Sequence, residues 1–172
     1  MTIDVTTLSI VYYPNDILRQ KAEEVDPNDA NVQEVARRMI ELMFEHNGVG
    51  LAAPQVGLPW RLFVTQDLEN EGEGVVWMNP VLETCDDTAE LEEEGCLSLP
   101  EIRADIRRPI GIRISGFDAC GQAHSCESDD FIARVWQHEN DHLDGVLIID
   151  KMSAMDRLVN RKLIKQLERL AK

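Results

Sequence analysis

The chain is short of basic residues, and this shortage narrows the classes of protein to which it can belong. Its 172 residues include 17 Lys and Arg against 32 Asp and Glu, so its formal net charge is −15. Phosphate contacts require a basic face, so DNA binding is not expected. No apolar run approaches the roughly 18–20 residues that a membrane-spanning helix needs, so we expect no membrane contact.

Proline, glycine and cysteine are also scarce. With 7 Pro and 10 Gly, the chain is neither a fibrous repeat nor a disordered tail, and its length suits one domain over residues 1–172. The start of the chain lacks the basic segment and apolar core of a signal peptide, which favours a cytoplasmic location. The 4 Cys form no C-x-x-C pair, and we expect them to be reduced. The oligomeric state stays open.

The hydrophobic periodicity predicts an α+β fold with a mostly antiparallel sheet. Apolar residues at three- and four-residue steps predict helices at 28–47, 129–143 and 153–171. Shorter apolar runs predict strands at 62–64, 75–78 and 106–117. The order of helix, strands and then helices is typical of α+β domains.

Three local expectations accompany these elements. Gly48 is expected to end the first helix in a left-handed turn. The charged run 90–94 is expected to be a solvated approach to the next element. The last helix is expected to bury one face, made of Leu158, Ile164, Leu167 and Leu170.

An H-E-x-x-H motif lies on the helix predicted over 129–143. His138 and His142 are four residues apart, so their imidazoles project from the same face of the helix at a separation suited to one metal ion. Glu139 lies beside them and can reach a water molecule on the ion without binding the ion itself. The motif predicts a metal-binding helix at the centre of the fold, although two ordinary histidines on a helix would give the same pattern.

A catalytic metal site needs a third protein ligand and an open position. The nearest carboxylates that follow the motif are Asp144 and Asp150, but neither has the spacing common to metalloproteases. Upstream, Cys96 in the segment 94–98 offers a thiolate beside a glycine that allows close backbone approach.

The segment G-V-G-L-A-A-P-Q at 48–55 is rich in small residues. Such residues allow tight packing or a close approach of the backbone to a ligand, and Gln55 ends the segment with an amide that can donate to an oxygen. A plain connector between helix and strand would explain the same composition.

Together, three segments resemble the signature motifs of the peptide deformylases, and they occur in the family's order. They are G-V-G-L-A-A-P-Q at 48–55, E-G-C-L-S at 94–98 and Q-H-E-N-D-H-L-D-G at 137–145. The resemblance extends to residues 13–19 and 78–80, so it covers nearly the whole chain.

The resemblance implies a role for each matched position. Cys96, His138 and His142 would bind one divalent metal, with Glu139 as general base and then general acid. The amide of Gln55 and the backbone N–H of Leu97 would stabilise the oxyanion. Other residues are expected to bind substrate, namely Val49, Gly50, Glu94, Gly95, Arg103, Phe131, Arg134 and Val135.

The implied reaction is the removal of formate from the N-formyl-methionine of newly made chains. The metal expected in the cell is Fe(II), with Zn, Ni or Co as substitutes after purification. A transient contact with the ribosome could use the basic residues of the last helix, although a solvated helix face explains them equally well. These residues are Arg157, Arg161, Lys162, Lys165, Arg169 and Lys172.

Arg134 departs from the pattern of many deformylases, in which the matching helical turn is apolar. Its stem could lie along the pocket wall with its head in water, or it could pair with Glu92 or Glu93. Asp141 could orient the metal-binding helix or form a surface salt bridge, and Arg103 could contact the substrate backbone or be solvated.

Two other functions fit parts of the sequence. A general H-E-x-x-H peptidase would cut internal amide bonds and would normally use an oxygen or nitrogen as third ligand. A non-catalytic, metal-stabilised domain that binds nascent chains would need four protein ligands and no open position. The presence of Cys96, Glu139 and Gln55 together favours the deformylase.

Overall fold

The computed structural model describes residues 2–170 and contains four α-helices, seven strands and three short 3-10 helices. The α-helices are α1 (Ala30–Glu45), α2 (Phe131–Leu143), α3 (Ile148–Lys151) and α4 (Ala154–Leu170). The strands are β1 (Gly50–Ala52), β2 (Leu62–Gln66), β3 (Gly74–Thr84), β4 (Ala89–Cys96), β5 (Leu99–Pro109), β6 (Ile112–Phe117) and β7 (Ala123–Ser128). The 3-10 helices are η1 (Val5–Thr7), η2 (Asp16–Arg19) and η3 (Ala53–Val56).

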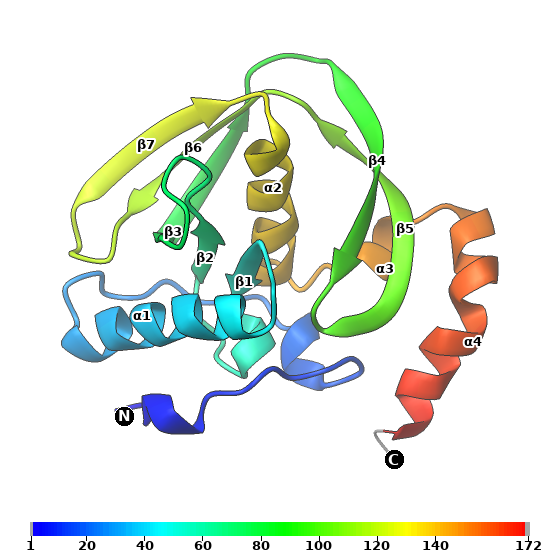
Figure 1. The fold of residues 1–172 in the computed structure, drawn as a ribbon, viewed down its shortest axis with the longest axis horizontal. Coiled ribbons are helices and arrows are strands. Elements are labelled where there is room, and N and C mark those ends of the chain that lie inside the picture. The colour runs from blue at the N-terminus through cyan, green and yellow to red at the C-terminus, as the bar shows by residue number, and fades with distance from the viewer. Residues whose placement is uncertain (1, 171–172) are drawn as a thin grey trace.

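Two antiparallel sheets enclose helix α2. One sheet has five strands in the order β1-β2-β3-β6-β7, and the other is the β4-β5 hairpin. Figure 1 shows α2 between them, with α1 below the larger sheet and α4 outside β5. The predicted α+β fold, with a mostly antiparallel sheet around a central helix and a helix at the C-terminal end, is therefore confirmed.

Apolar side chains pack α2 against the larger sheet, and they pack the hairpin against α3 and α4. Trp136 of α2 packs with Phe63 and Trp77 of the larger sheet. On the hairpin, β5 alternates buried and exposed positions, and its buried Ile102 and Ile106 pack with α3 and α4. Apolar packing thus fixes α2 against the larger sheet, and the hairpin meets α2 through polar contacts such as that of Arg134 with Glu94.

Of two expectations about the strands, the first was right in its solvation but missed the strand, and the second was wrong. The run 90–94 lies inside β4, because a two-stranded ribbon lets most of its charged side chains point to water while Glu94 points inward. The run 106–117 is divided between β5 and β6, which belong to different sheets. The first helix also ends at Glu45, two residues before the predicted end, and Asn47 rather than Gly48 adopts the left-handed conformation.

The inward face of α4 was only partly predicted. Ile164 and Leu167 pack against the hairpin, together with the buried side chain of Asn160. Leu158 is 63% exposed, because it lies on the opposite side of the helix from Asn160. Leu170 is also exposed, and Figure 1 shows the end of α4 leaving the body of the molecule.

Candidate metal centre and substrate pocket

Helix α2 presents two histidines and a glutamate to the space between the sheets. The rings of His138 and His142 lie one helical turn apart, with centroids 5.1 Å from each other. Burial lowers the pKa of His142 well below its ordinary value, helped by the charges of His138 and Arg108. His142 is therefore held as a neutral imidazole, the form that binds a metal.

Cys96 reaches the same point from the end of β4. The register of the hairpin shifts between Gly95 and Cys96, and this irregularity turns the cysteine toward α2. Its Sγ lies 3.3 Å from Nε2 of His142, and the ligand atoms of Cys96, His138 and His142 all lie within 4.8 Å of one another. A sulfur and two imidazole nitrogens at this spacing fit one divalent ion with an open position.

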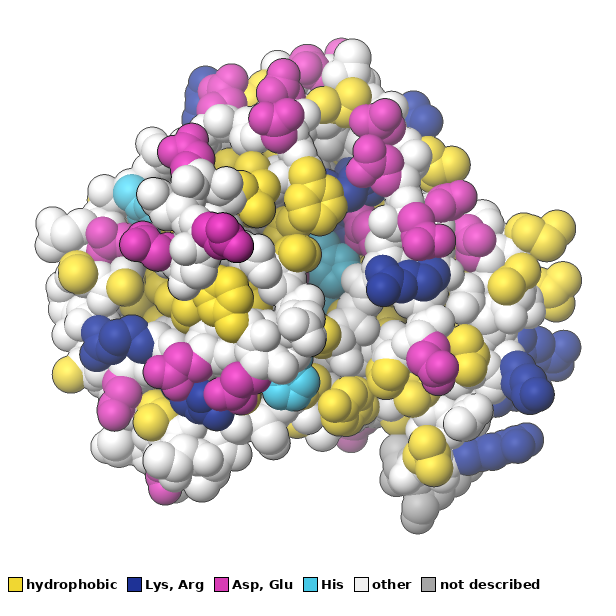
Figure 2. Space-filling view, in the orientation of Figure 1, with side chains coloured by type: hydrophobic (Ala, Val, Ile, Leu, Met, Phe, Trp, Pro, Cys, Tyr) yellow, Lys and Arg dark blue, Asp and Glu magenta, His cyan; other side chains and the backbone are white. Residues whose placement is uncertain are grey.

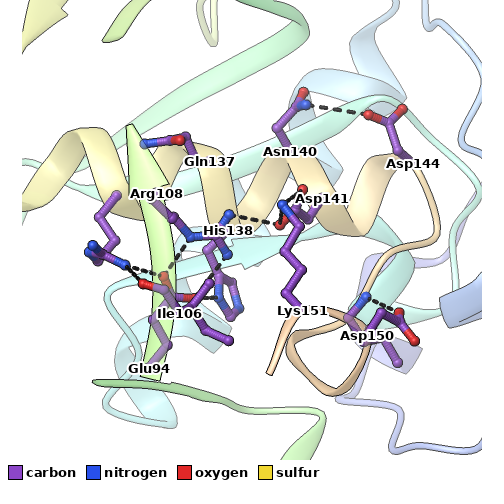
Figure 3. Close-up of polar contacts among 12 residues, drawn as sticks. Glu94, Ile106, Arg108, Gln137, His138, Asn140, Asp141, Asp144, Asp150 and Lys151 are labelled. Carbon is purple, nitrogen blue, oxygen red and sulfur yellow. Dashed lines mark hydrogen bonds and ion pairs between the residues drawn. The ribbon is translucent and has the colours of Figure 1, made fainter. Parts of the chain in front are cut away.

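Glu94 fixes the orientation of His138. Nδ1 of His138 lies 2.9 Å from Oε2 of Glu94, which leaves Nε2 of the ring for an ion. Arg108 donates to both oxygens of the same carboxylate, from Nε at 2.5 Å and from Nη2 at 2.9 Å (Figure 3). Burial acts to raise the pKa of Glu94, but the hydrogen bonds from Arg108 and His138 outweigh burial and hold that pKa well below its usual range.

The pKa of His138 responds to the same contacts. Burial acts to lower it, but hydrogen bonds with Cys96 and Glu94 raise it to about 10. A proton and a metal ion therefore compete for this ring, and metal binding releases the proton.

A chain of alternating charges continues away from the histidines. Arg108 donates to Asp141 at 2.8 Å, and Asp141 also accepts from Lys151 of α3, as Figure 3 shows. Asp141 thus stands between the two alternatives drawn from the sequence. Its two cationic partners both lie at 2.8 Å, and one of them, Arg108, is buried whereas the other, Lys151, is partly exposed.

Glu139 is buried in a tightly packed part of the site. Its side chain is 4% exposed, and its Oε2 has no hydrogen-bond partner among the described residues. A Cβ added to Gly50 would lie 2.5 Å from Oε1, so only glycine there leaves room for the carboxylate. Burial raises the pKa of Glu139 to about 7, against the opposing charge of His138. Such a carboxylate suits proton transfer near neutral pH.

Gln55 directs its amide toward the same centre. Its Oε1 accepts from the backbone N–H of Ala52, and its Nε2 donates toward Sγ of Cys96 at 3.6 Å and Oγ of Ser98 at 3.3 Å. The amide is thus fixed with its donor facing the cysteine. Leu97 lies in the turn between β4 and β5 and lines the adjoining cavity.

A cavity of about 510 Å³ opens beside this centre. In Figure 2 it is a hollow with histidine surface at its bottom and apolar surface beside it. All eight residues expected to bind substrate line it, namely Val49, Gly50, Glu94, Gly95, Arg103, Phe131, Arg134 and Val135. The structure also brings Cys96, His138, Glu139, Gln55 and Leu97 to its wall.

Two sheet edges border the cavity. β1 is the end strand of the larger sheet, and β4 pairs only with β5 among the described strands. Gly50 of β1 and Glu94 of β4 both line the cavity. An extended peptide entering between them could therefore pair with backbone on both sides.

The comparisons with known proteins agree along almost the whole chain. The family described as Polypeptide deformylase matches residues 7–158. A peptide deformylase of Borreliella burgdorferi is 43% identical over 144 residues, which are 83% of this chain and 86% of that protein. One from Thermotoga maritima is 42% identical over 160 residues, which are 93% of this chain and 96% of that protein. This chain belongs to the polypeptide deformylase family.

Solved deformylase structures share the fold in detail. The plant peptide deformylase PDF1B superposes with a TM-score of 0.91 at 36% identity, covering 99% of this chain and 94% of that chain. The Plasmodium falciparum peptide deformylase superposes with a TM-score of 0.87 at 36% identity, covering 94% of this chain and 95% of that chain. As a deformylase, this chain is a hydrolase that removes the formyl group from formylated nascent peptides.

Deformylase membership rules out the two rival functions, the general peptidase and the non-catalytic domain. No helix among residues 2–170 of this deformylase has both the length and the apolar character needed to cross a membrane.

The environment of Arg134 in this deformylase decides between its two alternatives. The guanidinium of Arg134 is not in water, because the side chain is only 9% exposed. Its guanidinium pairs with Glu92 at 3.1 Å, as one alternative held, and it also donates to Glu94. Arg103 is exposed and lies over Gly95, where its guanidinium would meet a Cβ.

Arg108 is the important residue that the sequence analysis missed. β5 alternates buried and exposed residues, and the buried register that holds Ile102, Ala104 and Ile106 continues to Arg108. A charged residue on the buried face of a strand needs a buried partner. That signal was available in the sequence, although it could not identify Glu94 as the partner.

Proposed function

We propose that Cys96, His138 and His142 hold one divalent metal ion, which is Fe(II) in the cell, and that the reaction takes place in the adjoining cavity on N-formyl-methionyl peptides. The observation that carries this proposal is the convergence of one sulfur and two imidazoles within 4.8 Å, beside a buried carboxylate. When bound, the ion supplies Lewis acidity, which lowers the pKa of a water molecule toward neutrality and polarises the formyl oxygen.

Glu139 moves the proton. As a carboxylate it takes a proton from the attacking water, and it then gives this proton to the nitrogen that leaves when the bond from formyl carbon to nitrogen breaks. Formate and a free amine result. Because Oε2 of Glu139 has no hydrogen-bond partner among the described residues, it is available to accept that proton.

Gln55 and Leu97 stabilise the negative charge that develops on the formyl oxygen. The amide of Gln55 is held by its own Oε1, so its Nε2 needs no reorientation during the reaction. The backbone N–H of Leu97 is the second donor.

The peptide lies extended between β1 and β4. Its backbone pairs with Gly50 on one side and with Glu94 and Gly95 on the other, and Arg103 contacts it near the cavity mouth. The first side chain enters the pocket walled by Val49, Phe131, Arg134 and Val135.

The function of Glu139 can be tested by substitutions that remove its carboxylate. We expect Glu139→Gln or Glu139→Ala to retain the metal but to lower formate release from a formyl-Met peptide by at least ~100-fold, the usual contribution of a general base. Glu127→Gln on β7, an exposed glutamate, is the matched control. Turnover near that of the wild type in a metal-replete Glu139 variant would refute the assignment.

The identity of the metal can be tested by anaerobic purification followed by metal analysis. Iron at one equivalent, lost in air together with activity, is the expected result, since a thiolate beside iron is exposed to oxidation. A preparation that is fully active with zinc alone would contradict it.

We further infer a cytoplasmic location and transient ribosome contact through α4. The location follows from the substrates, which are newly made chains, and from the need for a reduced Cys96. Arg157, Arg161, Lys162, Lys165 and Arg169 are all exposed on α4, and Lys172 lies outside the described residues. Co-sedimentation with ribosomes that weakens as salt rises, and is lost when these residues become Ser, is the expected result.

A further inference from the structure

Arg134 is a buried cation in the wall of the substrate pocket. Its Nη1 donates to Oε1 of Glu94 at 2.9 Å and to the carbonyl of Ile106 at 2.8 Å, while its Nη2 donates to the carbonyl of Glu90 at 2.9 Å. Its Nε lies 3.1 Å from Oε2 of Glu92. These contacts, from both strands of the hairpin, fix the guanidinium in one place.

The charge network around the histidines does not need this cation. Arg108 already binds both oxygens of Glu94 and one oxygen of Asp141, and Lys151 binds Asp141 from the other side. Two carboxylates are therefore matched by two cations. Arg134 is a third cation at the carboxylate of Glu94, and its other charged partner, Glu92, is half exposed, so the burial of the guanidinium itself calls for a reason.

The pocket supplies such a reason. A guanidinium taken out of water costs several kcal/mol unless it is well paired, so a buried Arg in a cavity wall is expensive compared with an apolar residue. Hydrogen bonds engage the guanidinium in its plane, which leaves its faces for contact with soft, polarisable groups. Of the neighbouring wall residues, Val135 offers dispersion contacts only, whereas the ring of Phe131 can also contact a sulfur.

We propose that Arg134 is a specificity-determining residue for the first side chain of the substrate, favouring the thioether of methionine over a hydrocarbon chain of equal length. The proposal rests on the proposed function, which places that side chain in this pocket. Sulfur is polarisable and a weak hydrogen-bond acceptor, whereas a methylene group beside a buried cation is neither.

The test compares formyl-Met-Ala-Ser with formyl-norleucine-Ala-Ser, in which a methylene replaces the sulfur. We expect kcat/KM of the wild type for formate release to favour the methionine peptide by about three- to tenfold. In Arg134→Met the ratio should fall by at least half, with Phe131 as the source of any preference that stays. Arg113→Met, which removes an exposed arginine paired with Glu127, should keep the wild-type ratio.

A wild-type ratio near one, or an Arg134→Met ratio equal to that of the wild type, would overturn the proposal. Should Arg134→Met fail to fold, Arg134→Lys decides, because an ammonium group keeps the charge but lacks the planar face. Its ratio is expected to fall by at least half, and an unchanged ratio contradicts the proposal.

Binding of the products separates this proposal from the proposed function. Calorimetry on the metal-loaded protein with Met-Ala-Ser and norleucine-Ala-Ser should show the same preference, again reduced in Arg134→Met. If the wild type released no formate from either peptide, the proposed function would fail, and the ratio of product affinities would still decide the role of Arg134.

Discussion

The lack of a Cβ at Gly50 leaves the space that the carboxylate of Glu139 occupies. An added Cβ would lie 2.5 Å from Oε1 of Glu139 and 2.9 Å from its Cδ. The carboxylate is buried and has little room to retreat. We therefore expect Gly50→Ala to lower kcat/KM by at least ~10-fold, since small displacements of reacting groups have large effects on rate.

Gly72→Ala is the matched control for that variant. Gly72 has a positive φ of 84° and nothing near its missing Cβ, so this change should cost stability without touching the site. Kinetics of formate release and urea unfolding of both variants separate the two effects. Gly50→Ala kinetics equal to those of Gly72→Ala would show that Glu139 has more freedom than its surroundings indicate.

His124 gives a prediction on pH. Its ring stacks on Trp77 with centroids 3.9 Å apart, and burial lowers its pKa, although the carbonyl of Val76 acts in the opposite direction. Between the folded pKa and the unfolded value of about 6.5, the unfolded chain binds more protons. The contribution of His124 to the free energy of unfolding is therefore fully present above pH ~6.5, and it declines as the pH falls below that value.

The measurement is urea unfolding at pH 7, 6 and 5. The wild type should lose more unfolding free energy between pH 7 and 5 than His124→Gln loses, because every other titrating group is common to both proteins. Parallel losses in the two proteins would contradict a lowered pKa for His124.

At the residue scale, the sequence predicted what local spacing determines. The four-residue step placed both histidines on one face, and the small residues around Gly50 indicated close approach. The partners of Glu94 could not be predicted, because Arg108 and Arg134 reach it from another strand and from α2. Such contacts depend on tertiary packing, which a single sequence does not encode locally.

At the scale of elements, α4 is attached to β5 through Asn160. This side chain is 5% exposed, and its Nδ2 donates to the carbonyl of Arg103 at 2.8 Å. Asn160→Ala leaves that carbonyl without its donor, so we expect a loss of about 1–3 kcal/mol of unfolding free energy. Val159→Ala, at a neighbouring position that is 72% exposed, should change it by less than about 0.5 kcal/mol. Urea unfolding of both variants checks this, and equal effects would refute it.

The helices were easier to predict than the strands, because a helix is determined by local spacing and a strand depends on its partner. An apolar stripe at helical spacing is visible in one segment, and α1, α2 and α4 all lie within the predicted ranges. The strand β4 carries glutamates at most of its central positions, and only its pairing with β5 makes it a strand. Such pairing involves two segments, so the pattern of one segment alone does not predict it.

At the scale of the whole molecule, the proposed metal centre joins two parts that otherwise meet through hydrogen bonds and ion pairs between side chains. Cys96 belongs to the hairpin, whereas His138 and His142 belong to the helix between the sheets. An ion that binds only the folded arrangement stabilises it by about 2.7 kcal/mol at a hundredfold excess over Kd. Removal of the ion by a chelator should therefore lower the unfolding temperature by roughly 5–10 °C for a chain of this size.

Cys96→Ala separates that linkage from side effects of the chelator. Without its sulfur the site keeps two imidazoles on one helix, and an ion held by α2 alone no longer ties the hairpin to the helix. The unfolding temperature of this variant should be the same with and without chelator, measured by calorimetry at fixed protein and metal concentrations. A chelator effect of equal size in Cys96→Ala would mean that the ion stabilises α2 or another site rather than the junction of the hairpin with α2.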